Sequence, residues 1–150
     1  MVRIAITKGR IEKDICEMLE KAGFNTKSIE SKDRELLVKI TDDIEIMFSK
    51  SNDILTFIEN GICDLGVVGK DTLDESEFKD YRELLDLNIG KCYFALAGLP
   101  EYKEKKKQDK TRIATRYPNI TKKYFFDKQE DIEIIKLEGS VELRTCVWNE

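Results

Sequence analysis

Apolar residues near the start of the chain alternate between strand-like and helix-like spacing. The β-branched and apolar run from Val2 to Thr7 is typical of a buried strand. After Lys8-Gly9-Arg10, apolar side chains recur on one face of a helix until Gly23, where a glycine favours a helix end. The pattern therefore predicts a strand, a turn and a helix. The apolar positions of that helix are Ile11, Ile15, Met18, Leu19 and Ala22.

The next segments continue this alternation. Two apolar runs flank the turn Thr41-Asp42-Asp43 and predict a hairpin. A short helix then ends at Asn60-Gly61, and Gly69 ends the buried strand that follows. The predicted elements are strands over 36–40, 44–48 and 63–68, a helix with Ile54, Phe57 and Ile58 on one side, a helix or loop over 72–79 and an extended segment over 84–87.

The second half has fewer elements. A charged stretch over 100–110 is interpreted as a solvated loop, because acidic residues and glutamine interrupt its lysines. Asn119 is predicted to be the N-cap of a helix. The other predicted elements are strands over 92–99, 112–115 and 132–137, and a helix that carries Ile120, Tyr124 and Phe125.

Strands and helices alternate along the chain, which predicts an α/β fold with largely parallel sheets. The segment over 90–100 is a candidate crossing between two lobes. We therefore expect residues 1–90 to belong to a first lobe and residues 91–150 to a second.

Length, charge and cysteine content argue against several classes of protein. A chain of 150 residues is one average domain or two small lobes, and its net charge of −4 argues against wholesale nucleic-acid binding. No apolar run approaches the length of a membrane span, and the first residues lack the features of a signal peptide. The four cysteines form no Cys-x-x-Cys pair, so we expect reduced thiols and a cytoplasmic protein with no membrane partner.

The chain contains no histidine. This excludes Ser-His and Cys-His catalytic units and any imidazole metal site, and we predict no metal ligands from the protein. The first candidate site consists of two cations that flank a glycine. Lys8, Gly9 and Arg10 follow a strand and begin a helix, where open α/β sheets bind ligands and helix N-termini attract anions. The alternative is a charged surface turn.

Three further segments are weaker candidates when each is taken alone. The strand end Gly69-Lys70-Asp71 offers Asp71 to a ribose hydroxyl or an amine, or is an ordinary turn; it lacks the pattern of a phosphate-binding P-loop. Lys91 is either a phosphate contact or a surface lysine. In Gly139-Ser140-Val141-Glu142-Leu143, Glu142 belongs either to a polar binding turn or to an ordinary helix start. Arg34 and Arg116 add cations in predicted connecting segments.

Five segments, taken in order, resemble the ATP phosphoribosyltransferase family, which catalyses the first step of histidine biosynthesis. No single segment is decisive, but their order and rough spacing are specific. The resemblance covers residues 2 to 143, and the ending Gly-Ser-Val-Glu-Leu favours the short form, which is a catalytic subunit. The segments are 4–10, 64–71, 85–92, 114–121 and 136–143.

The resemblance implies a fold and a reaction. The fold has two α/β lobes of the type II periplasmic-binding-protein kind around a cleft, with the second lobe incomplete in this chain. In the reaction, N1 of the adenine of ATP attacks C1′ of phosphoribosyl pyrophosphate and expels pyrophosphate. A ring nitrogen is already a nucleophile, which agrees with the lack of histidine. The resemblance also implies Mg²⁺ as cofactor, a homo-oligomer and a separate regulatory subunit.

The resemblance also implies roles for individual residues. Lys8, Arg10 and Arg34 would hold nucleotide phosphates, and Gly9 would let a phosphate approach the backbone. Asp71 would face the adenine or ribose side. Glu142, the predicted catalytic residue, would face the ribose or metal side, and the lesser candidates are Lys91 and Arg116.

The sequence departs from the family in two places. Lys50 stands where the family usually has arginine, and lysine keeps the charge but loses the bidentate fork for phosphate. The family's Asp-containing strand and Thr-Gly-x-Thr-like turn, which hold phosphoribosyl pyrophosphate, do not follow Leu143. We therefore expect the 150-residue chain to be inactive.

Residues 144–150 have no helical or strand period and carry the only tryptophan. With suitable synonymous codons, one inserted nucleotide after Leu143 converts the family's Ala-Pro continuation into these residues and places a stop codon after Glu150. A frameshift, a sequencing error and a natural end are the alternatives. The alternative functions are a nucleotide- or solute-binding module of the same fold without catalysis, and an α/β domain whose cations lie on the surface.

Overall fold

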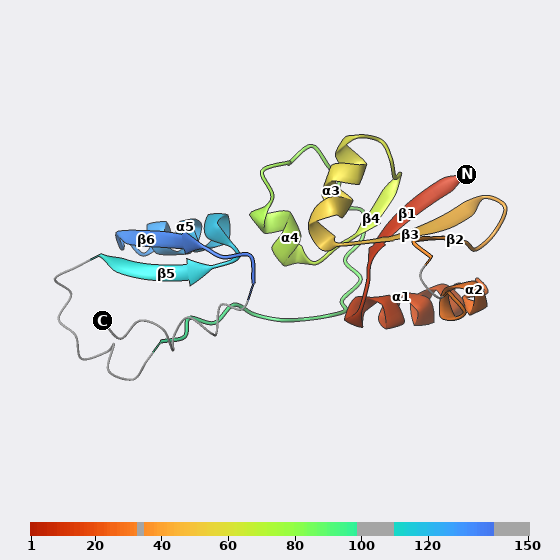
Figure 1. Ribbon diagram of the computed structural model, residues 1–150, viewed down its shortest axis with the longest axis horizontal. Coiled ribbons are helices and arrows are strands. Elements are labelled where there is room, and N and C mark those ends of the chain that lie inside the picture. Colours follow the sequence, from red (N-terminus) through yellow and green to blue (C-terminus); the bar gives the residue numbers. More distant parts are fainter. Residues whose placement is uncertain (33–34, 99–109, 140–150) are drawn as a thin grey trace. The chain divides into compact units, whose positions relative to one another are not determined.

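Two separate sheets organise the protein (Figure 1), whose structure is a computed structural model describing residues 1–32, 35–98 and 110–139. The side chains of Arg10 and Glu30 are outside this description. Contacts divide the chain into two units, Met1–Cys92 and Tyr93–Glu150. The expectation of lobes over 1–90 and 91–150 stays a prediction.

The first unit contains a four-stranded sheet with the order β2-β3-β1-β4. Strand β1 (Val2–Thr7) pairs in parallel with β3 (Ile44–Ser49) on one side and with β4 (Leu65–Val67) on the other. Strand β2 (Leu37–Lys39) runs antiparallel to β3. The predicted first strand, the hairpin and the largely parallel pairing are therefore confirmed.

Helices cover both faces of this sheet (Figure 1). On one side lie α1 (Arg10–Lys21) and α2 (Lys27–Glu30), and on the other lies α3 (Ser51–Glu59). The sequence did not predict α2, because a four-residue helix is too short to show a helical period. A further short helix, α4 (Lys70–Glu75), follows β4 and ends before the expected limit at residue 79.

The core consists of two apolar layers, because successive side chains of a strand point to opposite faces. On the α1 face, Ile6 and Phe48 pack with Ile15, while on the α3 face Ala5 packs with Ile54. Ile6, Ala5 and Ile54 are fully buried. The alternating apolar residues of β1 therefore join both layers. The buried members are Ile6, Ile15, Ile29, Val38, Ile46 and Phe48 in one layer, and Ala5, Ile54 and Cys63 in the other.

Strand β4 lies very close to α3. A Cβ atom added at Gly66 would come within 2.6 Å of Cγ2 of Ile54, so only glycine fits there without a shift. The strand is also shorter and more exposed than the predicted buried strand over 63–68, with Leu65 36% exposed. Its exposure follows from its position at the end of the strand order.

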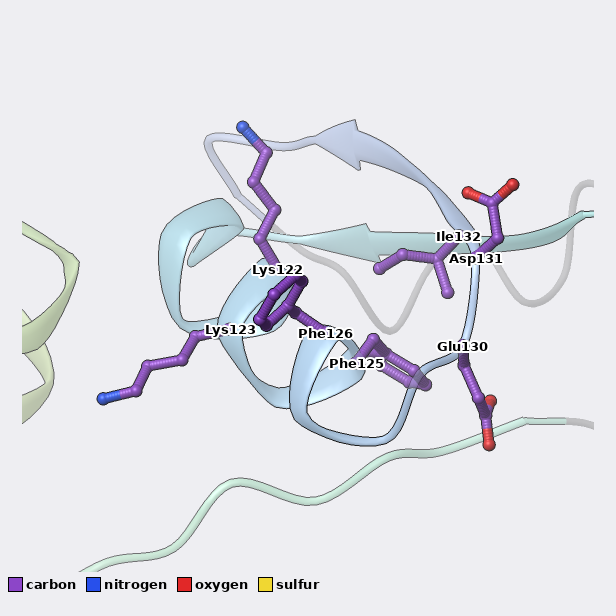
Figure 2. A pocket seen from close by; sticks show the side chains of 7 residues that line it. All are labelled: Lys122, Lys123, Phe125, Phe126, Glu130, Asp131 and Ile132. Atoms are coloured by element: carbon purple, nitrogen blue, oxygen red, sulfur yellow. The ribbon is translucent and has the colours of Figure 1, made fainter.

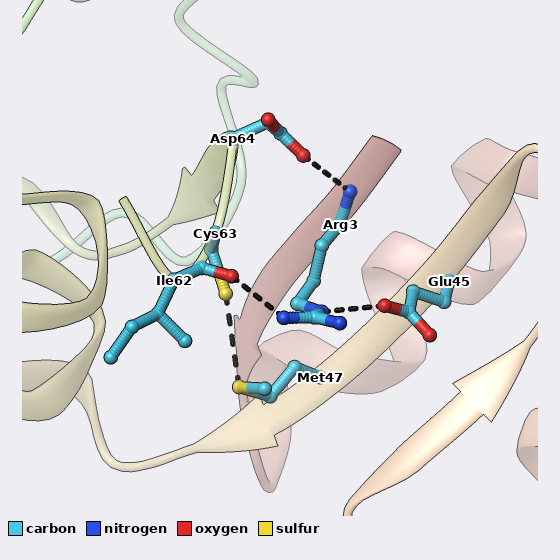
Figure 3. Close-up of polar contacts among 6 residues, drawn as sticks. All are labelled: Arg3, Glu45, Met47, Ile62, Cys63 and Asp64. Carbon is cyan, nitrogen blue, oxygen red and sulfur yellow. Dashed lines mark hydrogen bonds and ion pairs between the residues drawn. The ribbon is translucent and has the colours of Figure 1, made fainter. Parts of the chain in front are cut away.

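A polar network joins the amino ends of the parallel strands (Figure 3). The Arg3 guanidinium donates from Nε to Glu45 Oε1 at 2.5 Å and from Nη1 to the carbonyl of Ile62 at 3.0 Å. The backbone N–H of Arg3 donates to the Asp64 carboxylate at 2.7 Å. Glu45 is 7% exposed, so its charge needs this partner.

The second unit contains a parallel pair of strands, β5 (Thr111–Thr115) and β6 (Ile132–Lys136), joined by α5 (Pro118–Asp127). Ile113 and Phe125 are buried. The N-cap of α5 is Tyr117 rather than the predicted Asn119, because Pro118 occupies the first helical position, where its missing N–H has no cost.

The expected strand over 92–99 is wrong for residues 92–98, which form no strand, and residue 99 lies outside the described residues. Apolar side chains do not make a strand without a partner for the backbone. Tyr93 is accordingly 88% exposed and Leu96 68% exposed. Residues 84–87 also form no strand. Within the described part of the chain, no helix has the length and apolar character that crossing a membrane requires.

Candidate functional site

The carboxyl ends of three parallel strands lie side by side in the first unit. Thr7 at the end of β1 is in register with Ser49 of β3, and Ile6 is in register with Val67 of β4. A turn into a helix follows each strand, so α1, α3 and α4 all begin at this edge. Open α/β sheets bind ligands at the carboxyl ends of strands, between neighbours whose connections leave in opposite directions. Here the connection after β1 leads toward β3, and the connection after β3 passes back across β1 to β4.

Side-chain hydroxyls connect the three strand ends. Thr7 Oγ1 lies 3.3 Å from Ser51 Oγ at the start of α3. The same Thr7 oxygen donates to the carbonyl of Val67 at 3.5 Å. These hydrogen bonds hold the ends of the strands together at the edge. Sequence reasoning missed both hydroxyls, although Thr7 and Ser51 directly adjoin the predicted cations Lys8 and Lys50.

The turn after β1 is open to a ligand. Gly9 has φ 106°, a conformation that side chains rarely adopt, and a Cβ added there would meet no atom within 4 Å. Lys8 is exposed, and its backbone N–H donates to the carbonyl of Ser49 at 3.3 Å. Arg10 is the first residue of α1. The predicted anion-binding residues therefore lie at the start of a twelve-residue helix.

The turns after β3 and β4 bring two more predicted residues to this edge. Lys50 is exposed and is the N-cap residue of α3. Asp71 lies in the first turn of α4, and its carboxylate folds back against Gly69, where it occupies the space that a Cβ would need. The edge thus carries the cations Lys8 and Lys50 and the carboxylate of Asp71.

Lys70, between Gly69 and Asp71, has a partner of its own. Its ammonium donates to Glu83 Oε2 at 2.7 Å, and this hydrogen bond raises the pKa of Lys70 above its ordinary value. Both side chains are well exposed. Lys70 is therefore cationic at neutral pH but already paired.

The other predicted site residues lie in segments outside these three turns. Lys91 is exposed near the end of the first unit, in a segment without regular structure. Arg116 is exposed after β5, at the carboxyl end of the second sheet. Arg34 and Glu142 lie outside the described residues, as does the expected loss of resemblance after Leu143. Their roles stay predictions.

An open hollow of about 410 Å³ lies elsewhere, on the second unit (Figure 2). The phenyl rings of Phe125 and Phe126 line it, and the charged side chains around it extend outward. It lies against the amino end of β6, opposite to the end where such sheets bind ligands. None of the predicted site residues that the structure describes lines it. The lining residues are Lys122, Lys123, Phe125, Phe126, Glu130, Asp131 and Ile132.

Among residues 1–32, 35–98 and 110–139, no three His, Cys, Asp or Glu side chains are grouped as metal ligands. Of the predicted site residues described at the carboxyl edge of the first sheet, Lys8 and Lys50 are cationic and Asp71 is the one carboxylate. Such a set fits an anionic ligand better than a bare metal ion.

Known proteins resemble this chain along its length. The profile of the family described as ATP phosphoribosyltransferase matches residues 50–147, four residues beyond the expected limit at Leu143. A curated ATP phosphoribosyltransferase from Lactococcus lactis subsp. cremoris is 59% identical over 147 residues, which cover 98% of this chain and 71% of the relative. One from Clostridium botulinum is 47% identical and covers 97% of this chain and 70% of the relative.

A solved structure supports the same family. The ATP phosphoribosyl transferase (HisG:HisZ) complex from Thermotoga maritima contains a chain that is 28% identical, with a TM-score of 0.66. The match covers 98% of this chain and 69% of that chain. The mixed α/β fold and the family resemblance predicted from the sequence are thus both confirmed: the chain belongs to the ATP phosphoribosyltransferase family.

Proposed function

We propose that this chain carries the ATP-binding edge of an ATP phosphoribosyltransferase of the short, catalytic-subunit form. The observation that carries the proposal is the meeting of three turns at the carboxyl ends of β1, β3 and β4. Two of these turns present exposed lysines, Lys8 and Lys50, beside the starts of α1 and α3. Lysines beside helix N-termini favour phosphate.

The family reaction forms a bond between N1 of adenine and C1′ of phosphoribosyl pyrophosphate. The bond from C1′ to the pyrophosphate oxygen breaks, and its electron pair leaves with pyrophosphate. The attacking lone pair needs no general base, which suits a chain without histidine. The protein then has to position both substrates and neutralise the phosphates.

We assign the phosphates of ATP to the Lys8-Gly9-Arg10 turn and to Lys50. The positive φ of Gly9 and the open space beside it support a close approach of a phosphate to the backbone. Asp71 is assigned to a ribose hydroxyl or the adenine amine, because a carboxylate accepts hydrogen bonds from both. Arg34, Lys91, Arg116 and Glu142 keep the roles that the family resemblance implies.

The finer fold is part of the same proposal. The first unit would be one lobe of a type II periplasmic-binding-protein-like fold, and the second unit would be the N-terminal part of the other lobe. The parallel sheets and the solved relative with a TM-score of 0.66 support this assignment.

Mg²⁺, the partners and the location follow from the reaction and the family. Mg²⁺ is usually held by substrate phosphates, so we propose that it enters with phosphoribosyl pyrophosphate and that Glu142 faces the ribose or the metal, as the family resemblance implies. The Thermotoga maritima relative is a HisG:HisZ complex, which supports a separate regulatory partner. A homo-oligomer and a cytoplasmic location are proposed with it.

Calorimetric titration of the 150-residue chain with ATP, and then with phosphoribosyl pyrophosphate and Mg²⁺, tests the proposal. We expect ATP to bind, and Lys8→Ala to weaken binding about tenfold, since a charged hydrogen bond contributes roughly 1.5–3 kcal/mol. Lys39→Ala is the matched control, because Lys39 is exposed and lies on β2. Equal effects of the two variants, or no ATP binding, contradict the proposal. Product formation in the same mixture contradicts the expectation that this chain is inactive.

A further inference from the structure

Lys32 is a nearly buried lysine close to the turn that we assign to phosphate. Its side chain is 11% exposed, and its ammonium lies 3.4 Å from the centre of the Phe48 ring. The same ammonium forms an ion pair with the carboxylate of Glu12, which is 24% exposed. A buried ammonium needs such a partner, so both charges are built into the fold.

Glu12 connects this lysine to Gly9. One carboxylate oxygen pairs with Lys32, and the other accepts a hydrogen bond from the Gly9 N–H at 3.4 Å. The backbone N–H of Glu12 donates in return to the Gly9 carbonyl at 3.0 Å. Only the glutamate half of a capping box is present, because Gly9 has no side chain, and the two hydrogen bonds hold the turn before α1.

The Glu12 carboxylate lies beside the turn that we assign to phosphate, and both groups are negatively charged. A carboxylate at Glu12 favours the start of α1, but the same charge repels a polyphosphate at Gly9. The ammonium of Lys32 neutralises Glu12 from the protein side. The turn can then keep its cap and still attract an anion through Lys8.

We propose that Lys32 is a positioning residue that acts through Glu12, so that the Gly9 turn accepts the phosphates of ATP. This inference rests on the proposed function. Lys32 does not contact ATP in this arrangement. Its contribution is to cancel the charge of the capping carboxylate while holding it in place.

A purely structural role for the pair makes a different prediction. If Glu12 and Lys32 only stabilise the fold, removing either charge weakens both the fold and ATP binding. If Lys32 acts by neutralising Glu12, the two substitutions change ATP affinity in opposite directions. Lys32→Met leaves the carboxylate uncompensated, whereas Glu12→Gln removes the repulsion and keeps an oxygen for the Gly9 N–H.

The experiment is calorimetric titration of ATP into four variants of the full chain at low salt: Lys32→Met, Glu12→Gln, the double variant and Lys32→Arg. Thermal unfolding is recorded for each. Lys39→Met and Asp42→Asn are matched controls, because these residues form an exposed ion pair at 3.0 Å on the β2–β3 hairpin. They change net charge equally but leave the Gly9 turn intact.

We expect Lys32→Met to weaken ATP binding about tenfold and Glu12→Gln to tighten it, since one uncompensated charge at this range has an effect of that order. The double variant should return to near the original affinity, and Lys32→Arg should retain it. If Lys32→Met fails to fold, Glu12→Gln alone tests the inference, because loss of the ion pair by itself does not tighten binding. Weaker binding in both single variants, or effects equal to the controls, overturns the inference. No ATP binding by the unsubstituted chain overturns the proposed function as well.

Discussion

Thr7 and Ser51 link the end of β1 to the start of α3, with their hydroxyl oxygens 3.3 Å apart. Thr7 also reaches the carbonyl of Val67, so one side chain connects all three parallel strand ends at the proposed phosphate edge. The edge is therefore fixed by the protein itself before any ligand is present. Such preorganisation lowers the ordering cost of binding.

Thr7→Val tests this link, because valine keeps the shape and removes the hydroxyl. We expect a loss of about 1 kcal/mol in the free energy of unfolding, the usual net contribution of one hydrogen bond. Urea denaturation measures it. Ser51→Ala and the double variant complete a cycle, in which the two losses should be clearly less than additive. Full additivity would show that the hydroxyls do not interact.

Gly66→Ala should destabilise the first unit. The new methyl group would meet Cγ2 of fully buried Ile54 at 2.6 Å, and overpacking of this kind costs roughly 1–3 kcal/mol. Chemical denaturation measures the change in the free energy of unfolding. Gly98→Ala is the control, because a Cβ there meets no atom within 4 Å. Adding Ile54→Leu to Gly66→Ala removes the Cγ2 methyl group at similar side-chain volume. The double variant should therefore recover part of the lost stability.

Lys50→Arg should strengthen phosphate binding. Lys50 is exposed at the N-cap of α3, where a planar guanidinium could bind phosphate through two parallel hydrogen bonds. We expect ATP or phosphoribosyl pyrophosphate to bind several times more tightly in calorimetry, and Lys39→Arg on β2 to change nothing. An unchanged affinity would place Lys50 outside the phosphate contacts.

The cysteines should differ sharply in reactivity. Burial raises the pKa of the Cys63 thiol above its ordinary value, so less thiolate is present at neutral pH, and the thiolate is the reactive form. Cys63 is 4% exposed and lies 3.7 Å from the Met47 sulfur, whereas Cys92 is exposed. We expect iodoacetamide to label Cys92 well before Cys63, as followed by peptide mass spectrometry. Raising the pH should accelerate labelling of Cys63. Equal rates at neutral pH would contradict the buried position.

Local patterns predicted the elements that have strong internal periods. The apolar runs of β1 and β3 and the helix face carrying Ile11 and Ile15 indicated both the strands and α1. The same reasoning failed for residues 92–98, because a strand depends on a partner elsewhere in the chain and not on its own composition.

The sequence predicted the residues in the turns of the candidate site but not the contacts that support those turns. Lys8 and Gly9 were found because they follow a predicted strand, whereas Lys50 was found only through the family resemblance. The coupling of Glu12 to Lys32 was missed, since these residues are far apart in sequence. They meet only because the segment after α2 brings the Lys32 ammonium to Glu12 and the Phe48 ring. The one local signal was a glutamate at the third position of α1, where its carboxylate can accept from the N-cap backbone N–H.

The central position of β1 has a consequence for biosynthesis. The ribosome makes this strand before its parallel neighbours, which begin only at Ile44 and Leu65. At roughly 5–20 residues per second, the emerging strand waits some seconds with both backbone edges unpaired. The β2–β3 hairpin, whose strands are close in sequence, can form before β4 pairs with β1. We therefore expect a chaperone that follows nascent chains to engage the amino-terminal residues and to release them once β4 has been translated.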